Sequence, residues 1–264
     1  MTGPLLVVSG LSKHYRRAGR TITALDGVSF EVDRAETFAL VGPSGSGKST
    51  VARLLLRLAD ADAGDIRFEG RDLLALRGTK LRAVRPRLQM VFQDPLSAFN
   101  PRATVGRVLD DPLRIHGLVG RNERPGSIAA LLERVGLSPA LALRAIHEIS
   151  GGQRQRVAIA RAVATKPSLI VLDEALSSLD VSVRADILDL LVSLQRDEGI
   201  AYLLISHDLG VVGRIAHRVA IMEAGAIAET GDARQIIAAP TSLIGKALVA
   251  AMPSLAWLAS KETG

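Results

Sequence analysis

The order of hydrophobic and polar residues divides the chain into segments with different periods. Residues 5–15 and 28–42 alternate between apolar and polar types, which predicts β-strands, and a turn-rich stretch, 16–21, separates them. The end of the second segment, residues 37–42, is mostly apolar and runs into a glycine-rich loop. Apolar residues then recur at helical spacing over residues 49–58, so a helix is expected to begin where the loop ends.

Further along, the pattern predicts first a short hairpin, then helices alone, and then helices that alternate with strands. Residues 64–73 predict a short hairpin, and prolines divide residues 94–148 into helices with no strand pattern among them. Helices and strands then alternate, with helices over 151–166, 182–199 and 209–219, strands over 169–173 and 200–208, and a closing hairpin over 220–232. This order predicts an α/β fold with a mostly parallel sheet, an antiparallel β subdomain and an inserted helical subdomain.

The composition narrows the class of protein. The 264 residues are 48% hydrophobic and 23% charged, with a net charge of +6 and an isoelectric point of about 10.1. A basic chain favours phosphate-rich ligands, nucleic acid or an anionic membrane, although a solvated basic surface is the simpler interpretation. The absence of cysteine excludes disulfides, thiolate metal sites and cysteine nucleophiles. With no signal peptide and no apolar run of about 20 residues, we expect a soluble, cytoplasmic chain.

The glycine-rich loop carries the first chemical motif. Gly42, Gly47, Lys48 and Ser49 fill the spacing G-x-x-x-x-G-K-S of a phosphate loop, with a strand before it and a helix after it. Glycines let backbone N–H groups converge on an anion, to which the helix presents its positive end. Lys48 is placed to reach the β and γ phosphates, and Ser49 to hold Mg²⁺. The expected nucleotide contacts are Gly42, Pro43, Ser44, Gly45, Ser46, Gly47, Lys48, Ser49 and Thr50.

Two acidic residues end the apolar strand at residues 169–173. Asp173 is placed to complete the magnesium site that Ser49 begins, and Glu174 to orient an attacking water. Taken alone, the pair is equally typical of surface acids at the end of a strand. The intact phosphate loop favours the catalytic interpretation.

The sequence ISGGQRQRVAIARA, residues 149–162, points to a family. It resembles the signature of the nucleotide-binding subunits of ABC transporters, in which Leu-Ser-Gly-Gly-Gln precedes a helix. Ser150, Gly151, Gly152 and Gln153 match, and Ile149 replaces the leucine. The helix dipole, the free N–H groups and the serine hydroxyl make a second anion site.

Other motifs of this family follow in the family's order. Gln93 precedes the signature, and SSLD, which ends at Asp180, resembles the loop that crosses the dimer interface. His207 stands at the position of the switch histidine, and Tyr15 matches the aromatic residue that stacks on adenine. A lone histidine or tyrosine is more often a packed side chain, so the ordered set carries the resemblance.

The resemblance also predicts domains and a narrower group. It covers about residues 5–232 and implies an ABC ATPase domain over 1–231, with the helical subdomain at about 94–149, and a C-terminal extension over 232–264. The region after Gln93 and the tail are similar to ATPases of peptide and nickel importers. Thr-Ser-Leu replaces the usual His-Pro-Tyr of the tail, and Ala175 stands in place of a proline, as in the nickel-type second subunit.

The resemblance implies a mechanism based on a head-to-tail dimer that binds ATP and Mg²⁺ between the phosphate loop of one subunit and the signature of the other. Glu174 is then the general base, Lys48 neutralises phosphate charge, and His207 holds the γ-phosphate geometry. Gln93 senses both the metal and the permease. The implied metal ligands are Ser49, Gln93 and Asp173.

The implied partners are transmembrane permease subunits, a second ATPase subunit that is a paralogue rather than a copy, and, through the permease, an extracytoplasmic solute-binding protein. This places the chain on the cytoplasmic face of the membrane, with no nucleic acid partner. We expect residues 93–107 to dock on the permease through Leu96 and Phe99, unless these two side chains are buried in the helical subdomain. The alternatives are the ATPase of an exporter or lipoprotein-release complex, and a soluble ABC ATPase acting on nucleic acid.

Overall fold

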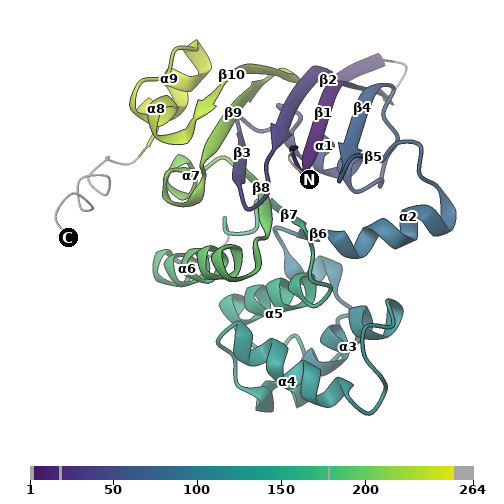
Figure 1. Cartoon of the computed structure of the whole chain (residues 1–264). Helices are drawn as coiled ribbons and strands as arrows, with labels where there is room; N and C mark the ends of the chain where they lie inside the picture. Colours follow the sequence, from purple (N-terminus) through teal and green to yellow (C-terminus); the bar gives the residue numbers. More distant parts are fainter. Residues whose placement is uncertain (1–2, 18–19, 178, 253–264) are drawn as a thin grey trace.

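The computed structural model describes residues 3–17, 20–177 and 179–252, which are drawn in colour in Figure 1. Ser178 of the SSLD motif and residues 253–264 of the predicted C-terminal extension lie outside the described residues.

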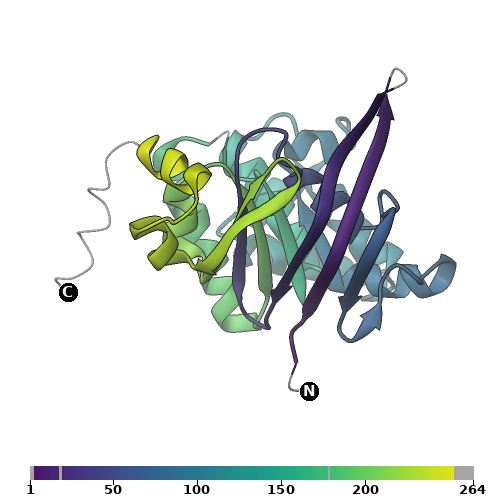
Figure 2. The same cartoon turned by 90° about the horizontal axis from the view of Figure 1, so that it is seen from above.

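The alternating N-terminal residues build an antiparallel sheet. Its strands are β1 (Leu6–Arg17), β2 (Arg20–Val32), β4 (Ala63–Phe68) and β5 (Arg71–Asp72), in the order β2-β1-β4-β5. β1 and β2 pair from Leu6 opposite Val32 to Arg17 opposite Arg20, so both strands extend into the stretch expected to be a turn. Figure 2 shows this long ribbon, at the purple end of the sequence, reaching beyond the rest of the molecule.

A second sheet has six strands in the order β10-β9-β3-β8-β7-β6. All neighbouring pairs are parallel except β10 with β9 at one edge. The strands are β3 (Thr37–Val41), β6 (Leu88–Val91), β7 (Leu169–Asp173), β8 (Ala201–Ser206), β9 (Arg218–Glu223) and β10 (Ala226–Asp232). The predicted α/β fold, with a mostly parallel sheet and an antiparallel β subdomain, is confirmed.

The central strands are apolar on both faces because each face meets its own hydrophobic cluster. On β3, Phe38 and Leu40 pack with α1 (Lys48–Leu55) and the antiparallel sheet. Ala39 and Val41 of the same strand join a second cluster, which contains side chains of α5 (Gly151–Val163), α6 (Val181–Glu198) and α7 (Leu209–Ile215). A continuous apolar run is the pattern expected of a parallel strand covered on both sides.

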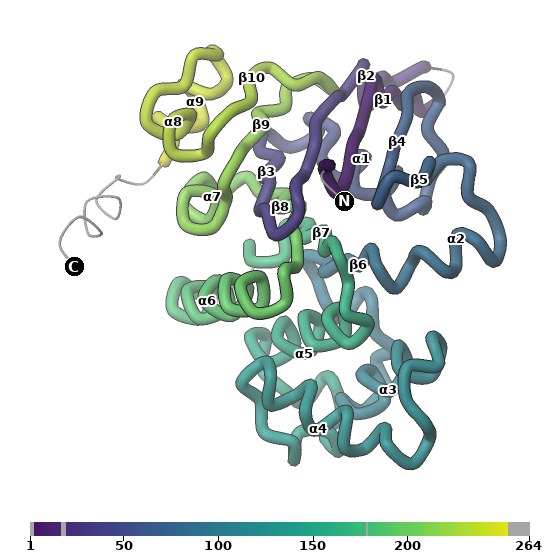
Figure 3. Tube along the Cα trace, viewed as in Figure 1, coloured from purple at the N-terminus to yellow at the C-terminus, as the bar shows by residue number. Residues whose placement is uncertain are grey.

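The predicted inserted helical subdomain forms a separate lobe, which the chain trace in Figure 3 shows below the sheets. Its elements are η2 (Pro95–Ala98), α3 (Val105–Ile115), α4 (Arg124–Arg134) and η3 (Pro139–Leu143). The Thr104 hydroxyl oxygen accepts a hydrogen bond from the Arg107 N–H at 3.3 Å and so caps α3. The numerical boundaries of the predicted domains stay predictions.

Three segments differ from the sequence-based expectation. The helix after the phosphate loop ends at Leu55, whereas the sequence predicted that it would extend to residue 58. α7 ends at Ile215 because the next residues enter β9, where Arg218 pairs with Phe38 of β3. Between β5 and the helical lobe lie α2 (Gly78–Val84), η1 (Arg85–Arg87) and the strand β6, for which no element was expected.

A single carboxylate fastens the end of the described chain to β10. Glu229 accepts hydrogen bonds from the N–H and hydroxyl groups of both Thr241 and Ser242, at 2.6–2.9 Å. Burial raises the pKa of Glu229, but these hydrogen bonds outweigh it and lower the pKa to about 2. They hold the start of α9 (Leu243–Ala250), which follows α8 (Ala233–Ala238).

We predict that Glu229→Ala frees α9 while leaving the rest of the fold intact. Hydrogen bonds to a charged group contribute about 1.5–3 kcal/mol each, so amide hydrogen exchange over residues 241–252 should accelerate by about tenfold or more. Glu223→Ala is the matched control, because Glu223 is an exposed glutamate of the same hairpin. Equal exchange in the two variants would contradict the anchoring role.

Candidate active site

The phosphate loop follows a backbone path that only glycine permits at two positions. Gly42 and Gly47 have φ angles of 151° and 106°. A Cβ atom at Gly42 would lie 2.2 Å from the carbonyl oxygen of Met222 in β9, and one at Gly47 would lie 2.5 Å from that of Ala24 in β2. The loop is therefore pressed against two strands that belong to different sheets.

The lysine of the loop is enclosed by it. The Lys48 Nζ donates hydrogen bonds to the carbonyl oxygens of Gly42 at 2.8 Å and Pro43 at 2.9 Å, and to the Ser46 hydroxyl at 3.3 Å. Burial lowers the pKa of Lys48, and the charges of Glu174 and Asp173 act against this shift. A cation is thus held at the centre of a loop rich in backbone N–H groups, which suits a polyphosphate.

The two predicted magnesium ligands from distant segments meet in the structure. The Ser49 hydroxyl donates a hydrogen bond to Asp173 Oδ1 at 3.2 Å. Burial raises the pKa of Asp173 and the charge of Glu174 adds to this, whereas the hydrogen bond from Ser49 and the charges of Arg53 and Lys48 lower it.

This donor set fits Mg²⁺ bound together with a nucleotide. The described residues contain no cluster of three or more His, Cys, Asp or Glu side chains that could hold a metal by themselves. Magnesium is usually held by one or two protein oxygens together with substrate phosphates and water, so a hydroxyl beside one carboxylate is a suitable site.

The next carboxylate lies beside the switch-position histidine. Glu174 follows β7 with a positive φ of 48°, and its N–H donates to the carbonyl oxygen of Ile205 in β8 at 2.9 Å. The Nδ1 of His207, just beyond β8, lies 3.5 Å from Glu174 Oε1. Adjacent parallel strands therefore bring this acid and this imidazole together at their carboxyl ends.

The phosphate loop and the acidic pair border one cleft of about 420 Å³. It is lined by Ile22, Thr23, Ala24, Ser44, Gly45, Gly47, Lys48, Ser49, Thr50, Gln93, Asp173 and Glu174. Tyr15 does not line the cleft, but it pairs with Ile22 across β1 and β2, and the Lys13 Nζ lies 5.4 Å from its ring centroid. The predicted adenine contact is thus paired across the strands with a residue that lines the cleft.

The signature residues lie outside this cleft. Ser150 and Gln153 form a capping box at the start of α5: the Ser150 Oγ accepts from the Gln153 N–H at 3.2 Å, and Gln153 Oε1 accepts from the Ser150 N–H at 3.0 Å. Gly152 packs so closely on α6 that a Cβ there would lie 2.6 Å from the Val183 side chain. Gly151, at the first position of α5, Asp180, at the N-cap of α6, and His207 also do not line the cleft.

Arg184 makes a contact near the predicted site that the sequence did not reveal. Its guanidinium donates to Asp208 Oδ2 at 2.7 Å and to the Leu179 carbonyl at 3.0 Å. It therefore ties the segment that carries Asp180 to the residue after His207. The two residues of the ion pair lie in different elements, so no local spacing indicated the contact.

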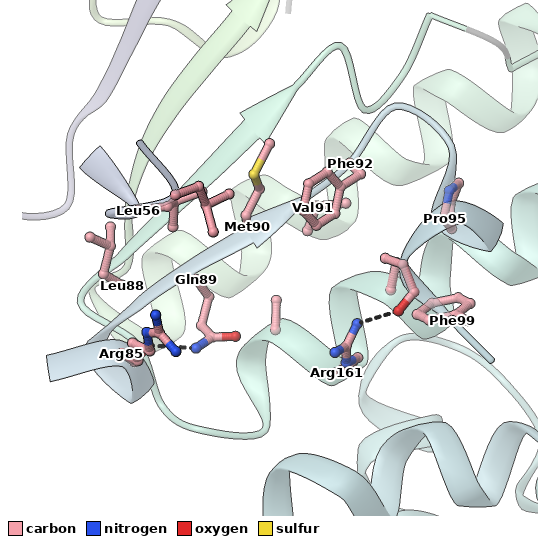
Figure 4. Close-up of a pocket in the computed structure, with 14 residues that line it drawn as sticks. Leu56, Arg85, Leu88, Gln89, Met90, Val91, Phe92, Pro95, Phe99 and Arg161 are labelled. Carbon is pink, nitrogen blue, oxygen red and sulfur yellow. Dashed lines mark hydrogen bonds between the residues drawn. The ribbon is translucent and has the colours of Figure 1, made fainter. Parts of the chain in front are cut away.

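An apolar groove of about 300 Å³ opens between β6 and the helical lobe (Figure 4). Phe99 lines it with only 8% of its surface exposed, as a member of the larger hydrophobic cluster, and Leu96 packs on that cluster without lining the groove. The Arg161 guanidinium donates to the Ala98 carbonyl at 3.2 Å and lies 5.7 Å from the Phe99 ring centroid. Of the two apolar side chains expected to dock, Phe99 is therefore buried and Leu96 is partly buried. Leu58, 61% exposed, is the most exposed apolar residue of the groove.

The strand–loop–helix unit around Lys48, with an acidic pair at the end of a nearby parallel strand, defines a P-loop nucleoside triphosphatase. The model of the ABC transporter family matches residues 25–177. The chain is 49% identical over 260 residues to a probable peptide ABC transporter ATP-binding protein, y4tS, of Sinorhizobium fredii, covering 96% of this chain and 74% of that protein. The chain therefore belongs to the ABC transporter family, as its motifs indicated.

Two further comparisons agree with this assignment. The glutathione import ATP-binding protein GsiA of Escherichia coli K12 is 50% identical over 237 residues, which are 90% of this chain and 38% of that protein, so this chain spans well under half of that relative. The dimeric ATP-binding cassette MJ0796, solved with ADP and Pi, superposes with a TM-score of 0.79 at 28% identity, over 87% of this chain and 99% of that one. The predicted resemblance to the peptide importer group is confirmed.

We predict that Gly42→Ala disrupts the phosphate loop more than Gly45→Ala. Both glycines have positive φ, which costs another residue about 1–2 kcal/mol, but only at Gly42 does the added carbon collide with a backbone oxygen. This clash should add about 1–3 kcal/mol of destabilisation and abolish ATP binding. Denaturant unfolding and nucleotide titration of both variants check this, and equal losses would show that the contact with Met222 is unimportant.

Proposed function

We propose that this chain hydrolyses Mg-ATP to energise the import of peptides or related small solutes through a membrane permease. The observation that carries the proposal is the single cleft shared by the phosphate loop, Asp173, Glu174 and Gln93. The printed names of the relatives, a peptide transporter component and a glutathione importer component, favour a peptide-like solute over nickel.

In this mechanism the cleft binds the phosphates of ATP, aligns the attacking water with them, and removes a proton from that water. Lys48 and the loop N–H groups would hold the β and γ phosphates, and Ser49, Asp173 and Gln93 would hold Mg²⁺, which when bound supplies positive charge against the developing phosphate charge. Glu174 accepts a proton from the attacking water. His207, whose Nδ1 lies 3.5 Å from Glu174 Oε1, orients this carboxylate and in this way holds the γ-phosphate geometry.

The signature supports an active unit of two subunits. Because Ser150, Gly151, Gly152 and Gln153 lie outside their own cleft, we propose that they complete the cleft of a second ATPase subunit arranged head to tail, with Asp180 at the junction. The dimeric form of the MJ0796 cassette supports this arrangement. We propose that this second subunit is a paralogue and not a second copy of this chain.

Coupling to the membrane is proposed to occur through the apolar groove. None of the helices in residues 3–17, 20–177 and 179–252 is both long and apolar enough to cross a bilayer. We propose that a short permease helix enters the groove beside η2, which follows Gln93 by two residues, so that phosphate sensing and docking are linked. The chain then acts at the cytoplasmic face, and a solute-binding protein delivers cargo to the permease.

We predict that Glu174→Gln binds Mg-ATP normally but hydrolyses it about 10²–10⁴-fold more slowly, because the amide keeps the shape and cannot accept a proton. Nucleotide titration and single-turnover hydrolysis measure the two effects separately. Glu133→Gln, at an exposed glutamate of α4, is the matched control and should keep full activity. Rapid turnover by Glu174→Gln would place the base elsewhere.

For the groove, we predict that Leu58→Glu abolishes co-purification with the permease and transport in vesicles, while Mg-ATP binding persists. A charge placed in an apolar contact loses its hydration without gaining a partner. Leu243→Glu is the control, because Leu243 is also highly exposed but begins α9, away from the groove (Figure 1). Normal transport by Leu58→Glu would show that the permease docks elsewhere.

A further inference from the structure

A run of basic residues borders the apolar groove and takes no part in the proposed chemistry. Between Leu73 and Gln93 the sequence contains no aspartate or glutamate and five basic residues, Arg77, Lys80, Arg82, Arg85 and Arg87. The whole chain has 33 basic and 27 acidic residues, so the two signs of charge are nearly balanced outside this stretch. This stretch is therefore a local concentration of positive charge.

The structure places these charges on the outer side of α2 and η1. The apolar residues Leu81 and Val84 of α2 face inward, where Val84 is only 5% exposed and both border Leu73 of the core. All five basic residues are exposed. A short helix with one buried apolar side and one solvated basic side is thus fixed to the body of the protein.

Most of this charge is not neutralised within the described residues. Arg87 pairs with Glu69 at 2.8 Å, and Arg77 lies 3.9 Å from Asp60, a carboxylate already bound by Arg57 at 2.8 Å. In the part of the chain that the structure describes, no ion pair involves Lys80, Arg82 or Arg85. We call these three residues the basic face.

The basic face is continuous with the groove proposed to receive the permease. Arg85 lines the groove, where Figure 4 labels it. The exposed Leu58 is another lining residue of the same groove. A permease helix can enter from the membrane only if this side of the molecule faces the bilayer. The position of the groove therefore directs the basic face toward the lipid headgroups, an orientation that rests on the proposed function.

We propose that the basic face binds the phosphate headgroups of anionic phospholipids next to the permease. Guanidinium and ammonium groups attract phosphate over about 10 Å without needing a fixed partner geometry, which suits mobile lipids. Residues 77–87, which carry the five basic side chains, contain no aromatic side chain on which nucleic acid bases could stack. The nearest aromatic residue in the sequence, Phe92, lines the apolar groove, so this composition disfavours a nucleic acid partner. The exposed Leu58, which lines the groove together with Arg85, adds an apolar contact with the same lipids.

The experiment measures co-sedimentation of the full chain with vesicles of phosphatidylcholine containing one quarter phosphatidylglycerol, and with vesicles of phosphatidylcholine alone. Each basic residue near an anionic surface raises partitioning about fivefold, so Lys80→Gln combined with Arg82→Gln should weaken binding to the anionic vesicles by tenfold or more. Arg234→Gln combined with Lys246→Gln removes the same charge from exposed positions on α8 and α9, and should change binding less than twofold, within about the error of the assay. Neither pair touches the nucleotide cleft or lines the groove.

A salt titration of the unaltered chain gives a second measurement that does not depend on the variants folding. Binding should collapse between about 0.1 M and about 1 M NaCl, where the screening length falls from about 10 Å to about 3 Å. Equal binding to neutral vesicles, or equal losses in the two double variants, would overturn the proposal. So would loss of permease co-purification without loss of vesicle binding, which would assign the basic face to an acidic permease segment. Mg-ATPase activity is measured in a separate assay. A chain without this activity would refute the proposed function, whereas the vesicle experiment would still test lipid binding by itself.

Discussion

The contact between Gly42 and the carbonyl oxygen of Met222 is the constraint on which the nucleotide cleft depends. It presses the start of the phosphate loop onto β9, while Gly47 presses its end onto β2. Within this loop the Lys48 amine donates to the carbonyl oxygens of Gly42 and Pro43, and α1 begins directly after Gly47. Ser49 then reaches Asp173 because the loop and β7 are both anchored in the same sheet.

The sequence was most informative where local pattern and chemistry coincide. The apolar runs of β3 and β7 and the spacing from Gly42 to Ser49 predicted a strand, a loop and a helix that the structure contains. The meeting of Ser49 with Asp173 was also foreseen, since the motif implies it. Roles that need a second subunit or a ligand, such as those of Gly151 and Asp180, stay predictions because one chain holds only part of that site.

Other features depend on contacts that no local pattern encodes. β6 is four residues long, and two of them, Gln89 and Met90, are only partly buried, so its alternation is too short to signal a strand. α7 ends early because Arg218 joins the sheet, a tertiary pairing that overrides the helical period. Phe99 is buried because it joins the larger hydrophobic cluster, where Arg161, from a helix that is distant in sequence, lies over its ring.

The helix α5 joins two regions that are otherwise separate. Its first turn carries the signature, and near its other end Arg161 donates a hydrogen bond to the Ala98 carbonyl beside the apolar groove. With 13 residues it is a rod of about 20 Å, and a rod of this length that tilts by about 10° moves its far end by about 3 Å. α5 thus has the form of a lever: a small rotation imposed at the signature becomes a displacement of the groove wall comparable to the length of a hydrogen bond.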